Sequence, residues 1–329
     1  MDKKIRIWYV GLIALVLLMI SVGGATRLTE SGLSITEWKP VTGIIPPLTD
    51  KDWLEEFGKY KLTPQYLLVN FQMDLSQYKS IYYWEYGHRL LGRIIFLYVL
   101  LPGLFFLRRK KVSLFNFSIL LTSIGFQGLM GWVMVKSGLI KEPQVSAYLL
   151  AVHYFLALAL LVYTFYLLCA YREPIYFKKK SETEWLTPTV GIFLCLQIFY
   201  GCLMSGLRAG YMSDTFPLMS GQFVPEHLFD FAALFVHWTH RWLGVAVAVL
   251  ITIYSISGLQ RTVRNSRGPF IHLLGITLSQ ILLGIILVIF HVPKIGAVFH
   301  QVMAALIVLG FCNILFRSKM NESGFYEKN

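Results

Sequence analysis

Long apolar runs separated by short polar segments divide the chain into repeated blocks. A helix needs about 20 mostly apolar residues to cross a bilayer. Eight windows meet this requirement: residues 7–25, 81–107, 114–136, 145–171, 186–206, 229–258, 269–291 and 296–316. The pattern predicts an all-α integral membrane protein with eight transmembrane helices, the first of them an uncleaved helix rather than a signal peptide.

The composition supports this class. Apolar residues make up 56% of the 329 positions and charged residues 15%, whereas soluble domains have about 45–50% and about 25%. The four cysteines lie inside apolar runs and form no C-x-x-C motif, so the sequence predicts neither a zinc ribbon nor covalently attached heme.

Basic residues gather between the apolar runs and predict the orientation. The net charge is +12, but short basic clusters beside spanning helices are typical of cytoplasmic loops rather than of a nucleic-acid surface. One side of the membrane collects seventeen lysines and arginines and the short loops opposite hold four, so both termini are expected in the cytoplasm. The seventeen are Lys3, Lys4, Arg6, Arg108, Arg109, Lys110, Lys111, Arg172, Lys178, Lys179, Lys180, Arg261, Arg264, Arg267, Arg317, Lys319 and Lys328; the four are Lys136, Lys141, Arg208 and Lys294.

One outer segment, residues 27–80, is much longer than the others and mixes charges with aromatic residues and prolines. Thr49 followed by Asp50 and Asp52 predicts the start of a helix just before Trp53. Such a helix lies on the membrane surface or forms a lid over an outer site, and the sequence leaves both readings open.

The apolar windows repeat as two sets of four. The second and sixth share H-R-x-L-G, at His88 and His240, with an offset of 152 residues. The third and seventh share Q-x-x-x-G, at Gln127–Gly131 and Gln280–Gly284, and the fourth and eighth share a histidine with alanine four residues later, at His153 and His300. The repeat predicts two tandem pseudo-symmetric four-helix bundles, residues 1–180 and 181–329, related by an axis along the membrane normal.

Ionisable residues inside spanning helices are costly and usually mark function. His88, His153, His240 and His300 lie one on each even-numbered window, about 4 to 11 residues from its outer end. Two imidazoles from facing helices at similar depth suit axial ligation of a heme iron, and the sequence therefore predicts one histidine pair in each half, near the outer face. A tetrahedral zinc site fits less well, because it needs four ligands.

The halves differ at one charged position. Glu85 precedes His88 by three residues, and His237 stands at the equivalent place before His240. A carboxylate beside a heme ligand can exchange a proton or stabilise positive charge on a substrate. The difference predicts chemistry in the first half, with Glu85 catalytic, and a heme held as cofactor in the second.

These residues resemble the heme A synthase family over nearly the whole chain. The stretch from Gly23 to Ser34, G-G-A-T-R-L-T-E-S-G-L-S, is the most specific match, joined by Glu85-x-x-His88-Arg89 and His240-Arg241. Some members carry a cysteine pair in the first outer loop. This chain has no cysteine before Cys169 and is similar to the members without that pair, including the mitochondrial type.

The resemblance implies oxidation of a ring methyl of heme o to a formyl group, giving heme a for terminal oxidases. By position, His88 and His153 would face the substrate heme with Glu85 catalytic, and His240 and His300 would ligate heme b. Other classes stay open on the residues alone: a diheme b-type electron carrier, and a non-enzymatic heme carrier or assembly factor.

The sequence and the resemblance also predict a cellular location and partners. The absence of a transit peptide favours the bacterial inner membrane over an organelle. Heme o synthase and oxidase assembly proteins are the partners implied by the family, and a homo-oligomer is compatible with it.

Overall fold

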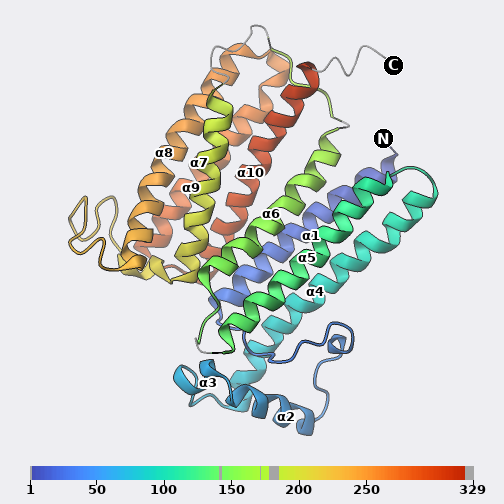
Figure 1. Ribbon diagram of the computed structural model, residues 1–329. Coiled ribbons are helices and arrows are strands. Elements are labelled where there is room, and N and C mark those ends of the chain that lie inside the picture. The colour runs from blue at the N-terminus through green and yellow to red at the C-terminus, as the bar shows by residue number, and fades with distance from the viewer. Residues whose placement is uncertain (1, 141–142, 171, 178–184, 323–329) are drawn as a thin grey trace. The chain divides into compact units, whose positions relative to one another are not determined.

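The computed structural model describes residues 2–140, 143–170, 172–177 and 185–322, without the side chains of 319–322. Within these residues the chain is helical, with isolated bridges such as Phe177 to Thr262 and no extended strand. Eight helices are long and apolar enough to cross a membrane. They are α1 (Lys3–Leu28), α4 (Leu75–Arg108), α5 (Leu114–Gly138), α6 (Ala147–Cys169), α7 (Leu186–Gly206), α8 (Ala232–Arg261), α9 (Gly268–Ile289) and α10 (Lys294–Glu322) (Figure 1).

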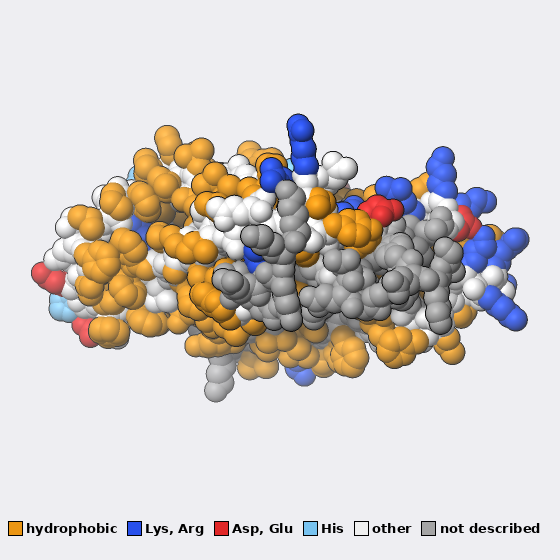
Figure 2. Space-filling model, turned by 90° about the horizontal axis from the view of Figure 1, so that it is seen from above, with side chains coloured by type: hydrophobic (Ala, Val, Ile, Leu, Met, Phe, Trp, Pro, Cys, Tyr) orange, Lys and Arg blue, Asp and Glu red, His pale blue; other side chains and the backbone are white. Residues whose placement is uncertain are grey.

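The eight predicted helices are confirmed, and the protein is a multi-pass membrane protein. Large apolar side chains on these helices are exposed, among them Phe115, Ile192 and Leu282. In the end-on view of Figure 2, hydrophobic side chains cover much of the described surface, and Lys and Arg form separate blue groups. Five of the basic residues used for the orientation, Lys141, Lys178, Lys179, Lys180 and Lys328, lie outside the described residues.

The chain forms two compact units. One comprises Gly11–Leu160, and the other comprises Leu161–Asn329 together with Met1–Val10. The predicted boundary between functional halves, at 180 and 181, falls outside the described residues, and the division of function between halves stays a prediction.

In the second unit, four helices close into a ring. Helix α7 packs on α8, α8 on α9, α9 on α10, and α10 returns to α7 (Figure 1). Small residues allow the close approaches, because a Cβ on Gly258 of α8 would lie 2.1 Å from the Phe270 ring of α9. Short 3-10 turns, η2 (Ala209–Met212) and η3 (Arg264–Ser266), join the helices at their ends.

In the first unit, α4 packs against both α1 and α5. A Cβ on Gly11 would clash with Tyr98 of α4, and one on Gly103 would lie 2.4 Å from the Phe117 ring of α5. Helix α4 begins at Leu75, six residues before the apolar window. Its polar first turns are stabilised by a capping box between Asp74 and Gln77, a signal that a hydropathy window does not detect.

The long segment between α1 and α4, predicted to be an outer segment, contains η1 (Thr42–Ile44), α2 (Asp50–Lys61) and α3 (Pro64–Leu68). Thr49 caps α2 with a capping box to Asp52, so the predicted helix start is confirmed. The aromatic face of α2 packs on the start of α4 and is therefore not available to lipid. The buried cluster consists of Trp53, Phe57, Tyr60, Tyr78 and Tyr82.

Candidate heme-binding site

The first histidine pair belongs to the unit Gly11–Leu160. His88 lies on α4 and His153 on α6. A glycine of a neighbouring helix faces each ring. A Cβ on Gly23 of α1 would lie 3.7 Å from His88 Cε1, and one on Gly131 of α5 would lie 3.2 Å from His153 Cε1.

The second pair has the same design. The rings of His240 on α8 and His300 on α10 have centroids 6.5 Å apart, with an interplanar angle of 66°. A Cβ on Gly201 of α7 would lie 3.3 Å from His240 Cε1, and one on Gly284 of α9 would lie 3.2 Å from His300 Cε1. Each imidazole of this pair therefore packs against a glycine, and a larger residue at that position would contact the ring closely.

The second pair has the spacing that a heme iron requires. A metal–imidazole bond of about 2 Å puts each ring centroid roughly 3 Å from the metal, so opposed axial imidazoles have centroids roughly 6 Å apart. The measured 6.5 Å fits. The buried Nδ1 atoms of His153 and His300 have no hydrogen-bond partner within the described residues.

Three glutamines support three of these histidines. The side-chain Nε2 of Gln127 donates to the backbone carbonyl of His153 at 3.0 Å, and Gln280 donates in the same way to His300 at 3.0 Å. Gln197 of α7 donates to the carbonyl of His240 at 3.1 Å. The first two belong to the repeated Q-x-x-x-G motif. Gln197 with Gly201 is a third copy that the sequence reasoning missed, although the same four-residue spacing was present to find it.

Glu85 is buried and bonded through both oxygens. Arg89 donates to Oε1 from Nε at 3.1 Å and from Nη2 at 2.7 Å, while Ser34 Oγ and the Ile35 backbone N–H donate to Oε2 at 2.7 Å and 2.9 Å. Arg89 also donates to the carbonyls of Ile35 and Glu37. The pair thus holds the segment that follows α1 against α4. Both the G-L-S match and Glu85 belong to this contact.

His237 makes a related contact in the second unit. It is fully buried, and Arg241 Nε donates to its Nε2 at 3.0 Å. Arg241 also donates to the backbone carbonyls of Thr215 and Ser213, in the segment that follows α7. The two H-R motifs therefore have the same structural role. Each arginine donates to backbone carbonyls of a segment in its own unit and to a side chain four residues earlier on its helix, a carboxylate in one case and an imidazole in the other.

A polar cavity of 350 Å³ adjoins the Glu85 network. Arg89 and Arg93 line it, as do Glu37, Lys39 and several residues of the outer segment. Hydrogen bonds from Lys39 and Lys59 lower the pKa of Glu37. Hydrogen bonds with Glu56, Glu55 and Glu37 raise the pKa of Lys59. These ion pairs keep the wall of the cavity charged and cross-linked.

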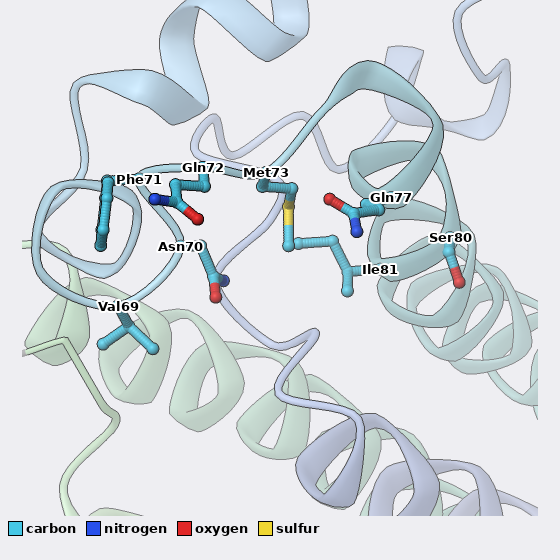
Figure 3. Close-up of a pocket in the computed structure, with 8 residues that line it drawn as sticks. All are labelled: Val69, Asn70, Phe71, Gln72, Met73, Gln77, Ser80 and Ile81. Atoms are coloured by element: carbon cyan, nitrogen blue, oxygen red, sulfur yellow. The ribbon is translucent and has the colours of Figure 1, made fainter.

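A larger hollow of 530 Å³ lies at the turn between α3 and α4. Figure 3 shows its lining side chains, which come from residues 69–73 and from the first turns of α4. None of the eight is a histidine or a charged residue. This hollow therefore offers no imidazole for a heme iron and no cation for the carboxylates of a heme, and the paired histidines remain the candidate site.

Comparison with known proteins identifies the family of this chain. The sequence model of the COX15-CtaA family, described as cytochrome oxidase assembly protein, matches residues 6–312. The chain belongs to the heme A synthase family. It is 34% identical to the heme A synthase of Wolbachia sp. subsp. Brugia malayi (strain TRS), over 97% of this chain and 98% of the relative. It is 40% identical to that of Ehrlichia canis (strain Jake), over 92% and 89%.

Family membership confirms the resemblance found in the sequence. The heme A synthase of Azorhizobium caulinodans is a further relative, 39% identical over 93% of this chain and 92% of the relative. The chain is thus an enzyme of heme A biosynthesis that serves cytochrome oxidase assembly. An electron carrier or a non-enzymatic heme carrier is not needed to explain the paired histidines.

Proposed function

We propose that this protein oxidises a ring methyl of heme o to the formyl group of heme a. In this proposal His88 and His153 hold the substrate heme, and His240 and His300 ligate a heme b. The observation that carries it is the 6.5 Å separation of the His240 and His300 rings, which suits a single iron between them, together with the same glycine-lined design around the first pair.

When bound, heme b would supply one-electron redox chemistry. The residues of the chain would position the hemes and enclose them. Glycines 131, 201 and 284 set the positions of three rings, and the glutamines hold the turns that carry them.

We propose that Glu85 serves the reaction as part of the Glu85–Arg89 pair. Its carboxylate is engaged by four donors, so any proton transfer at Glu85 requires one of these bonds to open. In the structure, the Glu85–Arg89 pair fixes one wall of the polar cavity of the first unit. Glu85 balances the charge of Arg89 at this wall, so the pair gives the cavity a fixed polar surface.

The setting proposed is the bacterial inner membrane, with both termini in the cytoplasm and the heme sites toward the outer face. Reporter fusions at the two termini test this orientation: active cytoplasmic reporters at both ends are expected, and an active periplasmic reporter at either end would contradict it.

The activity is tested by expressing the full chain with a source of heme o and separating the extracted hemes chromatographically. Heme a or a hydroxylated intermediate is expected. His88→Ala should remove the product and keep heme b, whereas His240→Ala should remove heme b. His227→Ala is the matched control, because His227 is exposed and pairs with Asp230 in an outer segment. Heme b alone from the unaltered chain, with heme o supplied, would overturn the proposal.

A further inference from the structure

Three of the four candidate ligand histidines face a Q-x-x-x-G motif on a neighbouring helix. The motifs are Gln127–Gly131, Gln197–Gly201 and Gln280–Gly284. In each, the glycine leaves room for the imidazole and the glutamine donates to the backbone carbonyl of the same histidine. One motif thus both makes room for a ligand and holds the helical turn that carries it.

The fourth histidine, His88, faces a different motif. Its glycine is Gly23 on α1, and four residues before Gly23 stands Met19 instead of a glutamine. Met19 nevertheless occupies the same place. A Cβ on Gly92, four residues after His88, would lie 3.6 Å from Met19 Cε, just as a Cβ on Gly244, four residues after His240, would lie 3.0 Å from Gln197 Nε2.

The replacement removes one bond and loosens one contact. A thioether has no hydrogen to donate, and among the described residues no side chain donates to the carbonyl of His88. The facing glycine also stands further away: its Cβ would lie 3.7 Å from His88 Cε1, against 3.2–3.3 Å at the other three histidines. His88 is therefore the least constrained of the four.

We propose that Met19 is a positioning residue that leaves His88 as the exchangeable ligand, so that the heme of the first half can enter and leave while glutamine holds the other three ligands in place. This inference rests on the proposed function, in which the first half binds a substrate and the second half a resident cofactor. A substrate site must release its heme at every turnover, whereas a cofactor site gains from retention.

A reciprocal exchange tests the proposal. Met19→Gln adds to the first half the donor that the second half has, and Gln197→Met removes that donor from the second half. Methionine and glutamine have similar volumes, so neither change alters packing much. The purified full chain, loaded with heme b and heme o, is mixed with an excess of apomyoglobin as a heme acceptor, and the loss of each heme is followed by extraction and chromatography.

We expect Met19→Gln to slow the release of heme o roughly two- to tenfold, the range for one hydrogen bond, and to leave the release of heme b unchanged. Gln197→Met should speed the release of heme b by a similar factor and leave heme o unchanged. Met19→Leu, which keeps the volume and adds no donor, should release heme o at the rate of the unaltered chain. Within each variant, the heme of the other half reports whether the protein is still folded.

Equal heme o release from Met19→Gln and the unaltered chain would overturn the role of Met19, as would an equal slowing by Met19→Leu. Should Met19→Gln fail to fold, Gln197→Met decides: unchanged heme b release would show that the glutamine does not retain heme. A chain that shows the expected release rates but never forms heme a would overturn the proposed activity and not the role of Met19. The two failures are therefore distinguishable.

Discussion

The two histidine sites differ most in how firmly their surroundings hold them. In the unit of α7 to α10, both histidines face a close glycine and both have a glutamine on their backbone carbonyl. In the unit of α1, α4, α5 and α6, only His153 has both, while His88 has Met19 and a more distant glycine. The first unit is therefore less constrained at one candidate ligand, His88.

The polar contacts outside the histidine sites differ in the opposite direction, because here the first unit is the more firmly bound. The first unit binds its segment 27–80 through both partners of the Glu85–Arg89 ion pair. In the second unit Arg241, which donates to His237, binds the carbonyls of Thr215 and Ser213 in the segment after α7. Only the first has a long outer segment, cross-linked by ion pairs around Lys59. The loosest ligand therefore lies in the unit with the most firmly anchored outer wall, an arrangement that suits a site that exchanges its ligand yet encloses it.

The largest effects are expected from the ligands themselves. His300→Ala should abolish heme b binding, and His153→Ala should remove the substrate heme and leave heme b in place. Even residues that only support a metal ligand change metal affinity about 10- to 100-fold, so loss of a ligand should exceed that. Heme content per chain after extraction is the measurement. Loss of both hemes from both variants would show that the halves do not bind independently.

Glu85→Ala should come next. It leaves four donors without their acceptor, including those of the partly buried Arg89, and loss of one partner of a buried ion pair typically costs about 3–5 kcal/mol. Turnover to heme a should be abolished while heme b remains. His237→Ala removes a neutral partner from Arg241 and should cost roughly 1–3 kcal/mol. Heme a yield and thermal unfolding are measured for both, with the exposed Glu173→Ala as control. Equal losses from Glu85→Ala and His237→Ala would remove the distinction between the halves.

The glycines should show a graded effect. Gly131→Ala and Gly284→Ala place a Cβ 3.2 Å from a histidine ring, which must then shift, and heme affinity at that site should fall about tenfold. Gly23→Ala meets His88 at 3.7 Å, an ordinary contact, and should have little effect. Gly275→Ala on α9, with nothing within 4 Å, controls for helix propensity. Heme titrations measure this order; a larger loss from Gly23→Ala would contradict the looser fit of His88.

The smallest effect concerns the outer segment. Lys59→Met should lower stability by about 1 kcal/mol or less, because these ion pairs lie near the surface and are screened. The raised pKa of Lys59 means that its contribution is present below the ordinary value of 10.5 and is lost as pH rises through the raised one. The lowered pKa of Glu37 gives a contribution present above 4.5 that is lost as pH falls through the lowered value.

Thermal unfolding midpoints across pH measure both effects, with Lys51→Met as the exposed control. A midpoint for Lys59→Met equal to that of the unaltered chain at neutral pH would show that the ion pairs do not stabilise the outer segment.

The sequence was sufficient for the helices and for the candidate ligands. Lipid imposes a length and an apolar composition on every spanning helix, so each window could be found without knowledge of its neighbours. Ionisable side chains are costly inside a spanning helix, so the histidines could be identified as candidate ligands from the sequence. The extension of α4 to Leu75 and the short helix α3 were missed, because both depend on capping and on packing of aromatic residues outside the membrane.

What the sequence by itself determined is the duplicated eight-helix architecture, the family, and the four histidines with Glu85 as the charged exception. Tertiary structure decided what those residues touch. It showed Glu85 engaged by four donors, Gln197 acting as a third copy of a motif, and Met19 standing where a glutamine would bind. The physical reason is that insertion into lipid depends on each helix separately, whereas hydrogen bonds between helices depend on which faces meet, and one sequence without its packing does not specify those faces.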